Sequence, residues 1–177
     1  MEPYAWTVVG AGPAGIAAVG RLLDHGTPDD QIGWIDPAFA AGDLGRKWRA
    51  VSSNTIAGTF LEYLNGSKAF RFSEAPPTPL KEVDPDETCA LALVADPLQW
   101  VTGRLRERVK ILQTTATALT LTQRRWRIET ELGEVESHNV VLAVGAVPKS
   151  LSYPHLEEIP VDVALDPERL ADQQLEG

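Results

Sequence analysis

The chain has 177 residues, 44% of them hydrophobic and 23% charged, a composition typical of one globular domain with its own core, with or without a tail. Twenty-five acidic residues against 16 basic ones give a net charge of −9, which opposes binding to nucleic acid and to anionic membrane surfaces. No apolar run approaches the roughly 18 residues of a membrane span and no signal peptide is visible, so we expect a cytoplasmic protein with neither partner.

The first 36 residues predict a strand, a glycine turn, a helix and a second strand. The apolar run Ala5–Val9 predicts the first strand, and the glycine-rich segment Gly10–Gly15 follows it directly. Apolar residues at helical spacing then predict a helix from Ala14 to His25. The run Ile32–Ile35 predicts the second strand, and Asp36 closes it.

This order of parts is the one that binds the pyrophosphate of a dinucleotide. Gly10 permits the tight turn, Gly12 lets the backbone approach the phosphates, and Gly15 lets the helix pack close to the strand. The helix directs its unpaired N–H groups and the positive end of its dipole at the phosphates. Asp36 is placed to accept hydrogen bonds from the adenosine ribose. Two alternatives stay open: a purely structural glycine turn, and an aspartate that only initiates a turn before Pro37.

A long segment with little periodicity follows the second strand. Residues Pro37–Pro85 are rich in Gly, Ser, Asn and Pro, which is typical of functional loops, and only Gly58–Leu64 predicts a short helix. Two helices are predicted next, over Glu87–Ala95 and Pro97–Val109. We expect the arginines of the second to form a solvated face, with phosphate binding as the alternative: Arg104, Arg106 and Arg108.

The second half of the chain predicts strands and then a tail. The predicted strands are Lys110–Gln113, Ala116–Gln123, Arg125–Glu131, Val135–His138 and Asn139–Val144. Turn residues between the middle runs indicate an antiparallel meander, whereas the continuous apolar run before Gly145 predicts a central parallel strand. We predict a domain of residues 1–150 and an acidic, proline-containing linker or tail of residues 151–177, with a helical pattern over Pro167–Leu175.

The residues with reactive side chains predict no catalytic centre. Cys89 is the only cysteine, which excludes an internal disulfide, a Cys-x-x-Cys pair and a multi-thiolate metal site, and its small apolar neighbours predict a buried packing role. The histidines have no metal-ligand spacing. Because there is no nucleophile–base pair or carboxylate dyad, we assign no catalytic residue and no metal site.

The chain resembles flavoproteins with two dinucleotide-binding domains, and within them the flavin-containing monooxygenase and N-hydroxylase branch. Three features carry the resemblance: the glycine turn near residue one, the Gly42–Arg49 segment with its Trp-Arg pair, and the strand end Val140–Pro148. It covers roughly residues 4–150. It implies an α/β Rossmann-like FAD/NAD(P)-binding fold, with a mainly parallel sheet and an antiparallel three-stranded meander.

The resemblance also implies which residues contact FAD. The glycine turn would hold the pyrophosphate through Gly10, Gly12, Pro13, Ala14 and Gly15, and Asp36 would hold the ribose. Trp48 and Arg49 would lie near the flavin or its ribityl chain, although a packed loop aromatic with a surface cation is an equal alternative. Ala116 would meet the adenine through its backbone. The strand end would line the cofactor again through Ala143, Val144 and Gly145. Two residues depart from the family pattern, since Val144 replaces a threonine and Asp36 stands where glutamate is more frequent.

In the resembling family, NADPH reduces FAD and the reduced flavin activates oxygen for transfer to a substrate. The strand end leads there into a second, NADPH-binding domain, and this sequence has no second glycine turn. We therefore interpret the chain as the FAD-binding part of an NAD(P)H-dependent oxidoreductase or monooxygenase, inactive by itself. The alternative is a non-catalytic FAD- or NAD-binding module for sensing or partner binding. The lone cysteine argues against a disulfide reductase, and the meander argues against a simple NAD-dependent dehydrogenase.

Overall fold

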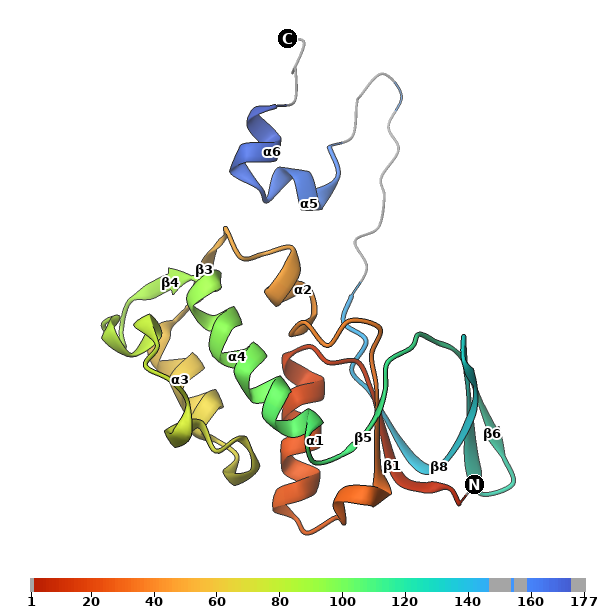
Figure 1. Cartoon of the computed structure of the whole chain (residues 1–177). Helices are drawn as coiled ribbons and strands as arrows, with labels where there is room; N and C mark the ends of the chain where they lie inside the picture. The colour runs from red at the N-terminus through yellow and green to blue at the C-terminus, as the bar shows by residue number, and fades with distance from the viewer. Residues whose placement is uncertain (1, 147–153, 155–158, 173–177) are drawn as a thin grey trace.

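The computed structural model describes residues 2–146, 154 and 159–172, and Figure 1 shows the whole chain. Short 3₁₀ turns connect some of its helices and strands. In chain order the elements are β1 (Tyr4–Val9), α1 (Pro13–Asp24), β2 (Ile32–Ile35), α2 (Gly42–Arg46), β3 (Ser52–Ile56), α3 (Ala57–Asn65), β4 (Thr88–Ala90), α4 (Leu91–Arg106), β5 (Lys110–Leu112), β6 (Ala116–Thr122), β7 (Arg125–Thr130), β8 (Gly133–Leu142), α5 (Val161–Ala164) and α6 (Pro167–Ala171).

The main sheet has six strands in the order β5-β2-β1-β8-β7-β6. Strands β5, β2, β1 and β8 run parallel, whereas β7 pairs antiparallel with both β8 and β6. This confirms the predicted α/β fold with a mainly parallel sheet and a three-stranded antiparallel meander. Parallel strands have their carboxyl ends at one edge of the sheet, so the loops after β1, β2 and β8 meet there.

Apolar side chains cover the two faces of the sheet unequally. On one face, buried Val8, Ile32 and Trp34 pack in one cluster with apolar residues of α1 and α4, including Val19 and Leu105. In Figure 1 these helices and α3 lie on the side of β1 away from the meander. The second cluster is smaller and joins the ends of β1 and β2 to β7 and β8: Val9, Ile35, Ile128 and Val135. The larger core therefore anchors α1, the helix that follows the glycine turn.

The predicted strands Val135–His138 and Asn139–Val144 are one strand, β8, which ends at Leu142. Its first half pairs antiparallel with β7 as far as Ser137, and from Ser137 onward it pairs parallel with β1. The polarity pattern changes because the environment changes along the strand: the first half is one strand of an exposed ribbon and the second half lies beside β1. The prediction divided one strand at this change of partner.

The prediction of two helices around Pro97 is wrong, because α4 runs unbroken through this residue. Proline removes one backbone donor and crowds the preceding turn. Buried residues on both sides of Pro97 nevertheless continue one apolar stripe: Val94, Leu98, Val101 and Leu105. Packing of this stripe outweighs the local cost of the proline. The residues just before α4 form β4, which pairs antiparallel with β3.

The other helix predictions agree with the structure to different extents. The short helix expected at Gly58–Leu64 is α3, and α2, β3 and β4 were not predicted. In the tail, α6 falls within the predicted helical stretch, whose residues 173–175 lie outside the described residues. The division at residue 150 stays a prediction. Among the described residues, no helix is both long enough and apolar enough to cross a bilayer.

Candidate functional site

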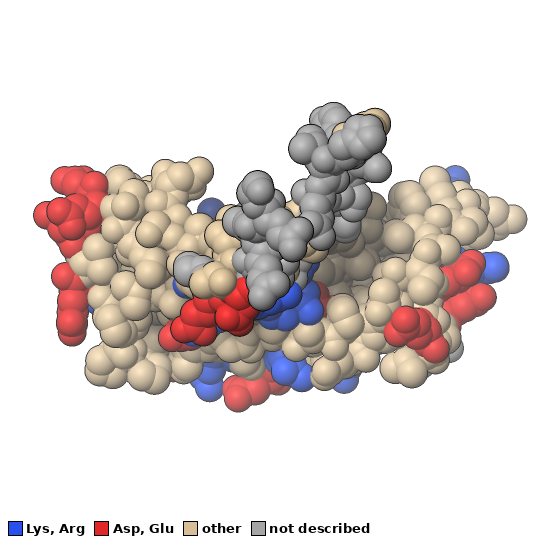
Figure 2. Space-filling model, turned by 90° about the horizontal axis from the view of Figure 1, so that it is seen from above, with Lys and Arg blue, Asp and Glu red and all other residues tan. Residues whose placement is uncertain are grey.

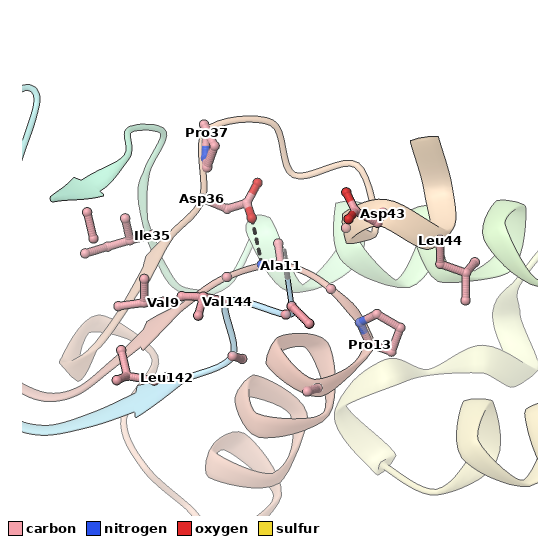
Figure 3. A pocket seen from close by; sticks show the side chains of 18 of the residues that line it. Val9, Ala11, Pro13, Ile35, Asp36, Pro37, Asp43, Leu44, Leu142 and Val144 are labelled. Atoms are coloured by element: carbon pink, nitrogen blue, oxygen red, sulfur yellow. Dashed lines mark hydrogen bonds between the residues drawn. The ribbon is translucent and has the colours of Figure 1, made fainter. Parts of the chain in front are cut away.

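A cavity of about 670 Å³ opens at the carboxyl ends of β1, β2 and β8 (Figure 3). Its walls come from five segments: the glycine turn, the residues after β2, the segment of α2, the residues between β5 and β6, and the end of β8. Ten of the twelve residues predicted for the site line it: Gly10, Gly12, Pro13, Ala14, Asp36, Trp48, Ala116, Ala143, Val144 and Gly145. Gly15 and Arg49 are not among the lining residues.

The glycine turn is held tightly by neighbouring backbone at Gly10 and Gly15. Gly10 adopts a left-handed conformation, with φ at +107°, and its N–H donates to the carbonyl of Ile35 at 2.8 Å. A Cβ atom at Gly10 would collide with the carbonyl oxygen of Ala143, and one at Gly15 would collide with the carbonyl oxygen of Gly10. Both glycines are therefore required by packing, as predicted for Gly10 as a turn residue and Gly15 as a packing residue.

Gly12 differs, because none of the described residues places an atom close enough to its Cβ position to require a glycine. A Cβ atom there would meet only the Cα of Gly42, at an ordinary 3.8 Å. Its φ of −77° is open to any residue. Gly12 lines the cavity, so the free space beside it lies where a ligand would approach.

The first turn of α1 presents N–H groups to the cavity. Gly12 is the N-cap and Pro13 occupies the first helical position, where its missing N–H costs nothing. The N–H groups of a helix's first turn have no intrahelical acceptor, and they carry the positive end of the dipole. The Tyr63 hydroxyl on α3 donates to the Pro13 carbonyl at 2.5 Å and holds this turn from behind. Burial raises the pKa of Tyr63, so the hydroxyl keeps its proton.

Asp36 points at the glycine turn and not away from it (Figure 3). Its Oδ2 accepts from the N–H of Ala11 at 2.8 Å, and its Oδ1 accepts from the N–H groups of Ala38 and Phe39 at 2.8 and 2.6 Å. The last two bonds are those of a turn-initiating aspartate. The structure thus contains the turn that the alternative interpretation required, and it also places the carboxylate in the cavity wall. Oδ2 accepts one of these bonds, and a carboxylate oxygen has room for a second.

The ends of β8 and β5 complete the cavity on the meander side. The N–H of Ala143 donates to the Val9 carbonyl at 2.8 Å, which ties the β8 end to β1. Val144 is 68% exposed and lines the cavity. Thr114, between β5 and Ala116, also lines it, and its buried hydroxyl has no hydrogen-bond partner within the described part of the chain.

The segment of α2 forms a polar and exposed wall. Asp43 accepts hydrogen bonds from Arg46 at 3.4 Å and Lys47 at 3.2 Å, and Trp48 is 37% exposed. Arg49 donates to Asp96 at 2.7 Å outside the cavity lining. For Arg49 this matches the surface-cation alternative, while Trp48 does line the cavity.

The residues that sequence reasoning missed at or behind the site include Trp34, Tyr63, Thr114 and Arg46. Trp34 Nε1 donates to the Gly10 carbonyl at 2.9 Å, and Tyr63 contacts Pro13 from 50 positions along the chain. Both look like core aromatics in the sequence, and no local pattern reveals their polar contacts. Arg46 lies two positions before the Trp-Arg pair, so attention to the whole basic run would have included it.

The surface shows no continuous basic area in the view of Figure 2, where acidic and basic side chains are interspersed. Arg104 pairs with Glu107 at 3.1 Å, Arg108 pairs with Asp29 at 3.0 Å, and Arg106 stacks on the Phe39 ring at 4.8 Å. None of these arginines lines the cavity, which favours the solvated-face interpretation. Cys89 is buried, as predicted, and the described residues contain no cluster of potential metal ligands.

A glycine turn between a parallel strand and a helix, with an acidic residue after the next strand, defines a Rossmann-like dinucleotide-binding domain. The chain belongs to the FAD-NAD(P)-binding family, whose sequence profile matches residues 7–147. The ligand-binding role of the glycine turn itself stays a prediction.

The chain also has a relative among the monooxygenases. The chain is 31% identical over 189 aligned positions to the monooxygenase AgnR1 of Paecilomyces divaricatus, a match that covers 96% of this chain and 48% of that protein. It thus spans about half the length of this relative.

Three solved structures share the fold. An oxidized steroid monooxygenase bound to NADP has a TM-score of 0.61 and 20% identity, over 86% of this chain and 28% of its own. A flavin-containing monooxygenase from Stenotrophomonas maltophilia has a TM-score of 0.56 and 18% identity, over 84% of this chain and 42% of its own. A thioredoxin reductase from Gloeobacter violaceus has a TM-score of 0.52 and 16% identity, over 87% of this chain and 40% of its own.

Proposed function

We propose that this chain is the FAD-binding portion of an NAD(P)H-dependent flavoprotein monooxygenase, and that its cavity holds the ADP half of FAD. The observation that carries the proposal is the convergence of the glycine turn, Asp36 and the β8 end on one cavity. Its volume of about 670 Å³ lies within the range of about 300–1,000 Å³ usual for cofactor and ligand sites. The relationship to a monooxygenase supports the reaction class.

The residues present fit such a cofactor at three places. The open space at Gly12 accommodates the close approach of a pyrophosphate, and the first-turn N–H groups of α1 supply donors for it. The remaining acceptor capacity of Asp36 suits a ribose hydroxyl. Ala116, where the resemblance places the adenine, lines the same cavity.

FAD, when bound, supplies the redox and oxygen chemistry, and the protein supplies orientation and exclusion of water. In this account Gly12 and the start of α1 bind the pyrophosphate, and Asp36 orients the ribose. The apolar side chains of Leu142 and Val144 shield the cavity edge. Exposed apolar residues at this edge, Leu142 at 60% and Val144 at 68%, suit contact with the cofactor or with a further part of a longer polypeptide.

An absorbance spectrum of the protein purified in its longest natural form tests the proposal. Bands near about 375 and 450 nm belong to the isoalloxazine ring, and we expect both. The 177-residue chain alone should retain FAD weakly and should not oxidise NADPH, because it spans only about half the length of its monooxygenase relative. A longest form without a flavin spectrum, and without one after incubation with FAD, would reject the proposed cofactor.

A further inference from the structure

The peptide unit between Gly10 and Ala11 is hydrogen-bonded at both ends. Its carbonyl accepts from Trp34 Nε1 at 2.9 Å, and its N–H donates to Asp36 Oδ2 at 2.8 Å. The carbonyl and N–H of a trans peptide point in opposite directions in one plane. Two bonds at opposite edges therefore fix the rotation of that plane, and no other protein group is needed to orient it.

Fixing this peptide plane restricts the backbone at Gly10, a residue that is otherwise conformationally free. Its backbone has φ at +107°, and a glycine allows the adjoining peptide to rotate far more freely than any other residue would. Packing against Ala143 excludes a Cβ atom, so a stiffer residue is not available at this position. The turn must be made rigid from outside, by side chains that contact its peptide groups.

Trp34 and Asp36 are themselves fixed by the same loop. The Trp34 indole is fully buried in β2 and meets the Phe39 ring edge to face, with centroids 5.1 Å apart. The N–H of Phe39 donates to Asp36 Oδ1 at 2.6 Å. One residue after β2 thus supports both side chains that hold the Gly10–Ala11 peptide.

We propose that Trp34 is a positioning residue of the cofactor site: its indole N–H, together with Asp36, sets the Gly10–Ala11 peptide plane and presents the glycine turn to the pyrophosphate. This inference rests on the proposed function. Trp34 acts through Gly10 and touches no cofactor atom in this account. Its position inside an apolar strand hides the role, because a buried tryptophan needs a partner for its N–H and here that partner is the binding turn.

The first test measures amide hydrogen exchange at Ala11 in the ligand-free chain. Trp34→Phe removes the donor, and site-specific replacement of Trp34 by benzothienylalanine removes only the N–H while keeping the ring shape. We expect Ala11 to exchange about 3- to 10-fold faster in both, the size of one lost hydrogen bond. Leu105→Ala is the control, since it weakens the same core without touching the turn. Unchanged exchange at Ala11 in the benzothienylalanine variant would overturn the proposal.

The second test measures ADP affinity by NMR titration of the same proteins. Both Trp34 variants should bind ADP about 3- to 10-fold more weakly, whereas Leu105→Ala should lower the melting temperature and leave the ADP Kd unchanged. A purely structural Trp34 would give equal Kd values in the wild type and the benzothienylalanine variant, which would reject the positioning role alone. A wild-type chain that binds neither ADP nor FAD would reject the proposed function, and the positioning role with it.

Discussion

The glycine turn and the segment of residues 42–49 line the same cavity, yet different forces hold them. Buried and half-buried partners fix the turn: backbone carbonyls lie against Gly10 and Gly15, Trp34 and Asp36 bond to its first peptide, and Tyr63 bonds to Pro13. Exposed ion pairs hold much of the other segment, with Asp43 bonded to Arg46 and Lys47. Buried hydrogen bonds resist change far more than surface ion pairs do. The comparison indicates that the glycine turn is a preorganised wall of the cavity and that the segment of residues 42–49 is an adaptable one.

The largest effect is expected where the turn has no spare room. Gly15→Ala should destabilise the fold by more than about 3 kcal/mol, because the new methyl group would collide with the Gly10 carbonyl. Gly103→Ala is a matched control in α4, since nothing lies within 4 Å of its Cβ. It should stabilise the protein by about 0.5–1 kcal/mol. Urea unfolding of both variants measures the contrast, and equal stabilities would contradict the packing argument.

Substitutions at Gly12 should lower ligand affinity with little change in the free energy of unfolding. Because a Cβ atom has space there, Gly12→Ala should keep the wild-type unfolding free energy within about 1 kcal/mol while weakening FAD or ADP more than about tenfold. Gly12→Asp should abolish binding, since its carboxylate would occupy and repel the approach of the pyrophosphate. Fluorescence titration measures both affinities. Retained affinity in a folded Gly12→Asp protein would remove the turn from the binding site.

A smaller loss is expected at Tyr63, which supports the turn through one hydrogen bond. Tyr63→Phe should cost about 0.5–1.5 kcal/mol of unfolding free energy near neutral pH. Burial raises the pKa of Tyr63 above the usual value of about 10. Above pH 10 the unfolded chain loses this proton while the folded chain keeps it, so stability falls as pH rises. The phenylalanine variant should lack this part of the alkaline loss, and parallel alkaline curves for both proteins would contradict the assignment.

The smallest effect is expected in the segment of residues 42–49. Arg49→Ala removes an exposed ion pair to Asp96 and should change stability by no more than about 1 kcal/mol. FAD affinity should stay within about twofold of the wild type, because Arg49 does not line the cavity. Asp96→Ala is the partner control, and the double variant should add little to either single one. A large loss of FAD affinity on Arg49→Ala, without one on Asp96→Ala, would show instead that Arg49 belongs to the binding site.

The sequence was sufficient for the elements whose signals are local. The strand, glycine turn, helix and second strand of residues 4–35 follow from periodicity and turn residues, and so does the meander. Ten of the twelve predicted site residues line one cavity, because parallel strands bring their carboxyl ends together. Two alternative roles were predicted for Asp36. Its hydrogen bonds to Ala38 and Phe39 are those of a turn-initiating residue. Its bond to Ala11 places the carboxylate at the glycine turn, and the ribose-binding role stays a proposal.

The errors come from contacts between distant segments. The local sequence around Pro97 predicts the end of a helix, but packing of the buried stripe from Val94 to Leu105 keeps α4 continuous through this residue. β8 was divided because its partner changes at Ser137. The polar contacts of Trp34 and Tyr63 join residues 24 and 50 positions apart, which no local pattern encodes.

Titration of the isotope-labelled chain with ADP, followed by amide chemical shifts, tests the central claim most directly. The account predicts that the largest shifts fall on the amides of Gly10, Ala11, Gly12, Ala14 and Gly15, followed by those after β2 and at Ala143–Gly145. Gly12→Asp should remove these shifts while the rest of the spectrum stays that of a folded protein. Shifts confined to other surfaces, or no shifts at millimolar ADP, would contradict a cofactor site at this cavity.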